Sequence, residues 1–287
     1  MNIQVHLTGL YLLDARRRTC YIFPMFVLLK LGGSLITDKT RPYTPRVDTL
    51  DNLALQIASA MQDNGDLRLI LGHGSGSFGH YAASQFGTRN GVSGAEAWRG
   101  FTEVWYQASA LNRLVIKAIR NAGLPGITLS PVPAVMARDG KITAWDLAPL
   151  KAALANGLLP VLHGDVVFDE SRGGTILSTE DLFAHLARQL HPERILLAGL
   201  EAGVWEDFPA RNHIIEEMTP QIYAQRAPDL GHRTGIDVTG GMQAKVTEML
   251  VLVEKVPGLE VLIFSGEEPG NARRALLGEN PGTLIHC

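Results

Sequence analysis

The chain has 287 residues, 46% of them hydrophobic, which is enough for one large core or two small ones. Its formal net charge of −3 excludes a global basic field that would attract nucleic acid, although local basic sites stay possible, and no apolar run reaches the roughly 18 residues of a membrane span. The two cysteines, Cys20 and Cys287, cannot form a metal cage or a disulfide framework, so we expect a cytoplasmic location.

Residues 1–24 differ from the rest of the chain. An apolar stretch at 10–13 precedes the basic residues 16–18, which is the wrong order for a signal peptide. Met25 then opens "MFVLLKLGGS", which predicts a first strand. Two interpretations stay open for 1–24: an upstream extension, with Met25 as the natural start, or a peripheral helix or arm.

Short apolar runs alternate with longer helical patterns in the first part of the chain. Strands are predicted at 26–31, 67–71, 127–129 and 158–162. Helical spacing predicts helices at 47–64, 94–121 and 146–156. The segment 166–176, broken by Gly173 and Gly174, indicates a hairpin.

The alternation continues to the end of the chain. A helix capped by Thr179, Glu180 and Asp181 is predicted to run to Leu190, and another covers 241–254, with strands at 195–197, 261–264 and 283–285. The proline-containing connection 199–241 has the least pattern, which is typical of a lid or a binding loop. Such alternation requires crossover connections and therefore predicts a mainly parallel sheet covered on both faces.

Glycine turns follow several of the predicted strands. They read "KLGGS" from Lys30, "GHGSGSFGH" from Gly72, "HGD" from His163, "AGL" from Ala198 and, late in the chain, "TGGM" from Thr239 with Lys245 nearby. Ligands of open parallel sheets bind at the carboxyl ends of the strands. Glycine turns expose backbone N–H groups, and a following helix adds partial positive charge, so these turns predict phosphate sites.

Neither common nucleotide signature fits these turns. The chain lacks a P-loop, and no acidic residue completes a dinucleotide fingerprint convincingly. Several phosphate turns with two neighbouring lysines therefore indicate phosphoryl transfer by another route, which requires positioning and charge neutralisation.

The turns, in this order, resemble the amino acid kinase superfamily from about Met25 to the end. "KLGGS" at Lys30 is similar to its opening motif, and "TGGM" with Lys245 to its late nucleotide-side motif. "HGSGSFGH" resembles a segment of the isopentenyl phosphate kinases, with Ser75 where glycine is usual, and "GDVVFDE", "ILSTEDL" and Lys39 also look like that group. Fosfomycin kinases share much of this pattern.

The resemblance implies an α/β fold, a three-layer α/β/α sandwich with an open, mainly parallel sheet of about eight strands. Residues 25–167 would bind the phosphate acceptor and residues 168–287 would bind ATP, with Mg²⁺ on the ATP phosphates and no metal ligand from the protein. It implies a homodimer without nucleic-acid or membrane partners. The implied reaction converts ATP and isopentenyl phosphate to ADP and isopentenyl diphosphate, as in an alternative mevalonate route.

The resemblance also implies roles for individual residues. Lys30, Lys39, His80 and Lys245 would be catalytic, and His80 would hydrogen-bond the acceptor phosphate, which as an anion requires no strong base. Ser75 and Gly164 would join His80 in binding the acceptor. The nucleotide would be bound by Lys30, Gly32, Gly33, Ser34, Gly76, Asp181, Gly241 and Lys245.

Some assignments stay open at this stage. Asp181 is either the nucleotide-side acid or a helix N-cap partner. Asp165 could organise Mg²⁺, bond Lys30 or cap a turn, whereas His73 is expected to be structural. The apolar acceptor tail needs a pocket, for which the helical residues available are Tyr81, Phe86, Phe101, Val104 and Trp105, unless they are plain core.

Three functions compete. The first is an isopentenyl phosphate kinase, and the alternative in the same fold is a fosfomycin kinase or another small phosphate or phosphonate kinase, whose pocket should be polar. The third is a nucleotide-sensing binding protein without turnover, which the joint presence of Lys30, Lys39, His80 and Lys245 disfavours.

Overall fold

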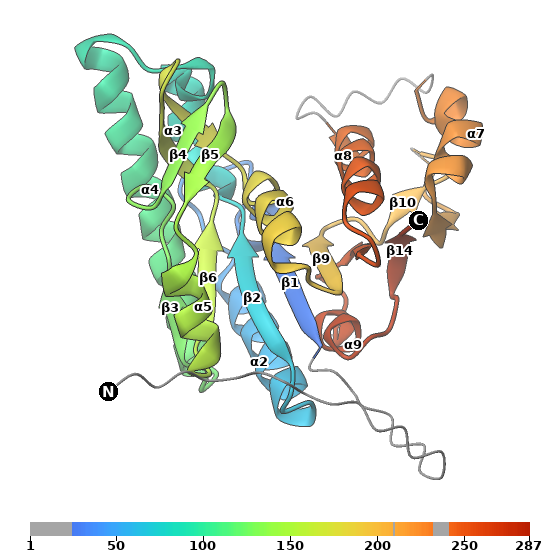
Figure 1. Ribbon diagram of the computed structural model, residues 1–287. Helices are drawn as coiled ribbons and strands as arrows, with labels where there is room; N and C mark the ends of the chain where they lie inside the picture. Colours follow the sequence, from blue (N-terminus) through green and yellow to red (C-terminus); the bar gives the residue numbers. More distant parts are fainter. Residues whose placement is uncertain (1–24, 209, 232–240) are drawn as a thin grey trace, which may run out of the picture.

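The computed structural model describes residues 25–208, 210–231 and 241–287, so the two interpretations of residues 1–24 lie outside the described residues. Its centre is an eight-stranded sheet in the order β12-β14-β13-β9-β1-β2-β6-β3 (Figure 1). β14 runs antiparallel to β13, and the other neighbouring pairs are parallel. The strands are β1 (Phe26–Leu31), β2 (Arg68–His73), β3 (Gly126–Thr128), β6 (Leu159–His163), β9 (Arg194–Gly199), β12 (Glu217–Met218), β13 (Glu260–Ser265) and β14 (Gly282–Ile285).

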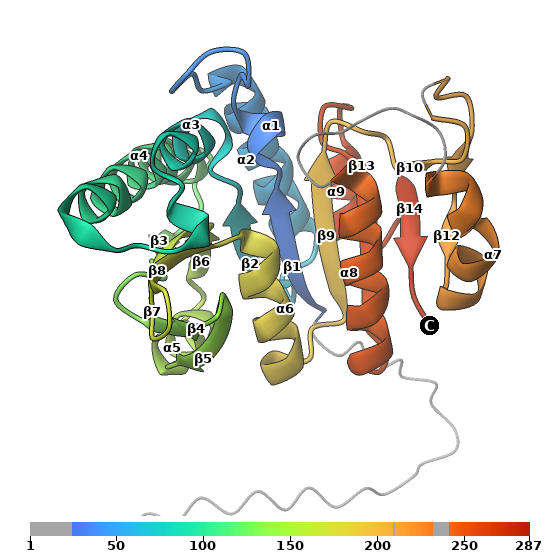
Figure 2. The same cartoon turned by 90° about the horizontal axis from the view of Figure 1, so that it is seen from above.

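Helices cover both faces of this sheet because its strands bury side chains on both sides. In β1, Val27, Leu29 and Leu31 join one core cluster and Leu28 joins the other, as the two-residue period of a strand requires. The first cluster includes α2 (Val47–Asp63), α4 (Gly94–Asn121) and α9 (Asn271–Leu276), and the second α5 (Ala148–Ala155), α6 (Thr179–Leu190) and α8 (Gly241–Lys255). Figure 2 shows α6 and α8 on one side and α2 on the other. The predicted three-layer α/β/α sandwich is confirmed.

A second, four-stranded sheet has the order β5-β4-β7-β8. β7 (Asp165–Asp169) and β8 (Gly173–Leu177) form the predicted antiparallel hairpin. The sequence prediction missed the hairpin of β4 (Val135–Arg138) and β5 (Lys141–Trp145), since the prolines before it were interpreted only as breaks.

The connection 199–241 is more regular than predicted. Its described part contains the antiparallel pair β10 (Val204–Trp205) and β11 (Ile214–Ile215), then β12, and then α7 (Pro220–Gly231), which contacts α8. In the described part of the chain, no helix combines the length and apolar character that crossing a membrane requires.

The second glycine turn continues directly into a helix. α3 (Gly76–Phe86) begins within "GSGSFGH", so His80 lies inside this helix. The left-handed φ of Gly76, 49°, allows the chain to change direction there. The first turn of α3 is therefore placed at the carboxyl end of β2.

Candidate functional site

Two glycine turns touch each other where β1 and β2 end. A Cβ atom on Gly33 would lie 2.5 Å from the nitrogen of Gly76, and one on Gly74 would lie 2.7 Å from the nitrogen of Gly33. The N–H of Gly32 donates to the carbonyl of Ala198 at 2.8 Å, which joins the end of β9 to the same place. Only glycine permits this backbone contact, so three strand ends form one backbone-lined surface.

A third glycine brings α6 against this surface. A Cβ atom on Gly72 would lie 2.5 Å from Thr179 and 2.6 Å from the ring of Phe183. The hydroxyl of Thr179 donates to the carbonyl of His73 at 2.6 Å and fixes the first turn of α6 there. Because Gly72 has no side chain, α6 can lie this close to β2. The contact sets the position of Glu180, which follows Thr179 in the chain.

Ser178 and Asp181 start α6 with a reciprocal capping box. The N–H of Asp181 donates to Oγ of Ser178 at 3.1 Å, and the N–H of Ser178 donates to Oδ2 of Asp181 at 2.7 Å. Asp181 is thus the N-cap partner, one of the two roles that the sequence left open. Its contact with the nucleotide stays a prediction. The N-cap itself is Ser178, one residue before the predicted capping segment.

The carboxylate of Glu180 pairs with Lys30, and the charge of Lys245 also acts on it. Lys30, near the carboxyl end of β1, forms an ion pair with Glu180, and both side chains are largely shielded, at 12% and 15% exposed. Burial raises the pKa of Glu180, but the charges of Lys30 and Lys245 outweigh this effect, so its pKa is lowered overall. Glu180 was not predicted from the sequence, because the role of the nucleotide-side acid was considered for the neighbouring Asp181. Its position after a capping serine, at a helix N-terminus, is the signal that could have found it.

The charges of three cationic side chains act on His80. The ring reaches solvent, yet the surrounding atoms remove enough water to lower the pKa of His80, and the charges of Lys39, Arg89 and Lys30 lower it further. Arg89, from the short helix η1 (Thr88–Asn90), was not predicted. The ring is therefore neutral at pH 7 and can donate one hydrogen bond.

Buried polar groups surround Gly164 and Asp165, next to the end of β2. The N–H of Gly164 donates to the carbonyl of His73 at 3.3 Å, and a Cβ atom there would lie 3.2 Å from the nitrogen of Thr179. Asp165 lies 3.2 Å from Nε2 of His163 and accepts from the N–H of Val166. Burial raises the pKa of Asp165. The three roles considered for Asp165 stay open, since its contacts are with His163 and with the backbone of its neighbour Val166.

His73 has a structural environment, as expected. Its ring is fully buried and stacks on His163, with centroids 5.3 Å apart and an angle of 9°. Nδ1 lies 3.1 Å from the carbonyl of Gly74, and Nε2 lies 3.1 Å from Oδ1 of Asn112. Burial lowers the pKa of His73 to about 3, so the ring is neutral in the folded protein at physiological pH.

This neutral ring predicts a loss of stability in mild acid. An unfolded His73 takes up a proton near pH 6.5, whereas the folded ring resists it down to about pH 3. The free energy of unfolding should therefore fall as the pH decreases below 6.5, with His73 contributing about 1.4 kcal/mol per pH unit. Urea unfolding at pH 7.0, 6.0 and 5.0 should show a shallower fall in His73→Gln. Equal slopes in the two proteins would contradict this assignment.

The residues considered for the acceptor tail divide into three groups by their burial. Phe101 and Val104 of α4 are buried in a cluster with Ala82, Val92 and Val166, close to His80 along α3. Phe86 packs on Gly100, where a Cβ atom would lie 2.3 Å from its ring. Tyr81 and Trp105 are exposed. The tail pocket stays a prediction, with Phe101 and Val104 as its interior residues.

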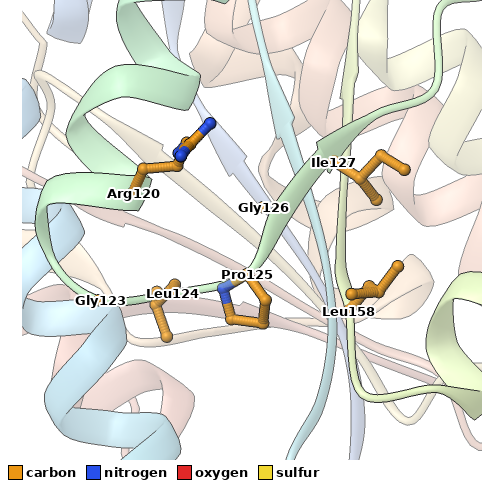
Figure 3. Close-up of a pocket in the computed structure, with 7 residues that line it drawn as sticks. All are labelled: Arg120, Gly123, Leu124, Pro125, Gly126, Ile127 and Leu158. Atoms are coloured by element: carbon orange, nitrogen blue, oxygen red, sulfur yellow. The ribbon is translucent and has the colours of Figure 1, made fainter.

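The remaining predicted residues lie at the edges of the site or beyond the described residues. Ser34 is half-buried in α1 (Gly33–Ile36), and Ser75 precedes α3. Gly241 begins α8, whereas Thr239 and Gly240 lie outside the described residues. A separate cavity of about 490 Å³ lies where β3 and β6 begin, at the other end of the strands (Figure 3). No predicted site residue lines it, so we give it no role in the reaction.

Comparison with known proteins agrees with this geometry. The model of the amino acid kinase family matches residues 25–265. An isopentenyl phosphate kinase from Methanocaldococcus jannaschii is 32% identical over 270 residues, 91% of this chain and 98% of that protein. Another, from Haloferax volcanii, is 35% identical over 260 residues, 90% of this chain and 98% of that protein. A solved isopentenyl phosphate kinase structure has a TM-score of 0.76 and 30% identity, covering 91% of this chain and 99% of that one.

Proposed function

Because the chain belongs to the amino acid kinase family, and within it to the isopentenyl phosphate kinases, we propose that it transfers the γ-phosphoryl group of ATP to isopentenyl phosphate, giving ADP and isopentenyl diphosphate. The observation that carries this proposal is the contact of two glycine turns where β1 and β2 end, with Lys30 near one strand end and His80 in the helix that follows the other. The charges of Lys39 and Lys30 both act on the imidazole of His80. Phosphoryl transfer depends mainly on positioning and charge neutralisation, which these groups supply.

On the donor side, Lys30 and Lys245 would hold the ATP phosphates. Glu180 supports both ammonium groups, since their charges act on its carboxylate. Backbone N–H groups of Gly33 and Gly76 would approach the same phosphates closely, and Gly32, whose own N–H is bonded to Ala198, would leave room for them. Ser34, Asp181 and Gly241 would contact the phosphates from the rim. As the γ-phosphoryl group moves, Lys30 would offset the charge that develops on the leaving β-phosphate.

On the acceptor side, His80 would orient the attacking phosphate oxygen through its ring N–H. That oxygen is already anionic, so no residue has to remove a proton from it. Lys39 would contact the transferring group, and Ser75 and Gly164 would contact the acceptor phosphate. We place the acceptor-binding part at residues 25–167 and the ATP-binding part at residues 168–287.

Magnesium would enter the site with ATP. Burial raises the pKa of Glu248 in α8, and the charges of Asp181 and Glu180 raise it further. Carboxylate oxygens are ligands suited to Mg²⁺. In the described part of the chain, no three metal-binding side chains are close enough to hold a cation by themselves. When bound, Mg²⁺ would neutralise phosphate charge, and Glu180, Asp181 and Glu248 are the carboxylates that could help the ATP phosphates to hold it. We also propose that the protein forms a homodimer and is located in the cytoplasm.

The apolar cluster beside α3 favours the isoprenoid acceptor over fosfomycin, whose polar phosphonate would need a polar pocket. A coupled ADP-release assay with isopentenyl phosphate, fosfomycin, glutamate, carbamate and UMP tests the proposal. Isopentenyl phosphate should give the highest kcat/KM. Faster turnover of fosfomycin would support the alternative kinase. If none of the five compounds led to ADP release, a nucleotide-sensing protein would be supported.

Shortening Phe101 should change the choice of acceptor. The ring is buried and lies against Gly174, where a Cβ atom would be 2.8 Å from it, so Phe101→Ala would leave a space at the end of the proposed tail pocket. We expect the ratio of kcat/KM for geranyl phosphate to that for isopentenyl phosphate to rise about 10-fold or more. Trp105→Ala, at an exposed position on the same helix, is the control. An unchanged ratio in Phe101→Ala would place the tail elsewhere.

A further inference from the structure

The loop that carries Lys39 is closed at its base. Residues 37–45 connect α1 to α2, and Thr37 and Pro45 pair in an antiparallel bridge. The N–H of Asp38 donates to the carbonyl of Thr44 at 2.9 Å, and the N–H of Arg46 donates to the carbonyl of Ile36 at 2.8 Å. Lys39 is exposed, but it directly follows Asp38, whose backbone is bonded to Thr44.

Asp38 fixes the backbone around Lys39. Its Oδ1 accepts from the N–H of Thr40 at 2.9 Å and from the hydroxyl of Thr40 at 2.6 Å, and its Oδ2 accepts from Nε of Arg41 at 2.8 Å. The Thr40 hydroxyl and N–H, followed by Arg41, lower the pKa of Asp38 to about 2, so these bonds persist at neutral pH. The turn at the tip of the loop is thus internally organised.

Tyr43 ties the same loop to α3. Its ring packs edge-on against Phe78, with centroids 5.9 Å apart, and against Tyr81, with centroids 5.5 Å apart. These two residues flank His80 in α3, two positions before it and one after it. The contact joins the loop with Lys39 to the helical turn with His80.

The backbone of Tyr43 is strained. Its φ is 53°, in the left-handed region that a bulky residue rarely adopts. Such a conformation persists when the surrounding contacts over-determine it, and strain of this kind is concentrated at functional sites. Glycine would accept this φ without strain but would lack the ring. The loop therefore keeps the aromatic contact despite the backbone cost.

Two further bonds extend the connection to the glycine turns. The N–H of Ser77 donates to Oγ1 of Thr37 at 2.9 Å, and that hydroxyl donates to the carbonyl of Gly33 at 2.7 Å. The N–H of Thr44 lies 3.3 Å from Oγ of Ser77. Both ends of the loop are thus bonded near the two phosphate turns, while Tyr43 holds its middle.

We propose that Tyr43 is a positioning residue for Lys39: it holds the loop 37–45 on α3, so that the ammonium group of Lys39 stays beside His80. The role of Lys39 on the transferring phosphoryl group rests on the proposed function. The effect of Tyr43 on the reaction acts through Lys39, which distinguishes Tyr43 from a residue that only stabilises the fold.

A double-mutant cycle tests this proposal. Tyr43→Ala should lower kcat for the acceptor that the wild type uses by about 10- to 100-fold, because a displacement of about 1 Å can have that effect. The Kd of ATP should stay within about twofold, and Tyr43→Phe, which keeps the ring, should restore the rate. In a Lys39→Met background, Tyr43→Ala should cause no further loss, since its route of action is already removed.

Losses that multiply in the double variant, or an unchanged kcat in Tyr43→Ala, would overturn the proposal. If Tyr43→Ala does not fold, Tyr81→Ala removes one of the two ring contacts at an exposed position, and its smaller loss should show the same dependence on Lys39. Wild-type turnover of isopentenyl phosphate is measured first. Its absence would contradict the proposed function, while the cycle can still be run with whichever acceptor is used.

Discussion

Replacing Lys30 with methionine should lower kcat by about 100- to 1000-fold, the effect of losing one preorganised charge from a phosphoryl-transfer site. Lys30 lies where β1 ends, between β2 and β9, and is largely shielded from solvent beside Glu180. Methionine keeps much of the side-chain volume but removes the ammonium group. ADP release under saturating ATP and acceptor measures the change.

Lys141→Met is the matched control for Lys30→Met, because Lys141 is exposed at the start of β5. It should keep the wild-type kcat. Lys30→Met leaves the carboxylate of Glu180 with Lys245 alone, so thermal unfolding should be followed in both variants. A folded Lys30→Met protein with kcat within threefold of the wild type would contradict the role of Lys30.

His80→Ala should reduce kcat/KM for the phosphate acceptor by about 100-fold while changing the Kd of ATP by less than about twofold. The physical reason is that His80 lies in the first turns of α3, among Lys39, Arg89 and Lys30, and offers a neutral ring N–H to an anionic group. His80→Gln keeps a hydrogen-bond donor and should recover part of the loss. Acceptor titrations and ATP calorimetry separate the two effects.

The control for His80 is His286→Ala, at the end of the chain beyond β14, which should alter neither value. Equal losses in acceptor turnover and in ATP affinity for His80→Ala would mean that the histidine supports the site as a whole. That result would contradict its assignment to the acceptor side.

The central sheet could be predicted because its signal is local. β1, β2, β6 and β9 are short apolar runs between helical patterns, and α4 was predicted with the bounds Gly94–Asn121 that it has. The β4–β5 hairpin was missed although Asp139 and Gly140 form its turn, both with positive φ, 52° and 74°. An Asp-Gly pair is a strong hairpin signal, and the preceding prolines concealed it.

The site residues that lie at or just after the end of a strand could be predicted from the sequence. Lys30, the glycine turns and His80 all belong to such positions, which bring distant segments together at one edge of a parallel sheet. Glu180, Arg89 and Tyr43 were missed, because their contacts depend on how α6, η1 and the loop 37–45 pack. The spacing of residues along the sequence reveals neither these contacts nor the φ of Tyr43.

A crystal structure with a non-hydrolysable ATP analogue, Mg²⁺ and isopentenyl phosphate tests most directly whether two phosphate groups meet at these turns. We expect the β- and γ-phosphates between Lys30 and Lys245, and the acceptor phosphate within hydrogen-bond distance of His80, in line with the γ-phosphate. Phosphates bound elsewhere, or His80 facing away from the acceptor, would contradict the account.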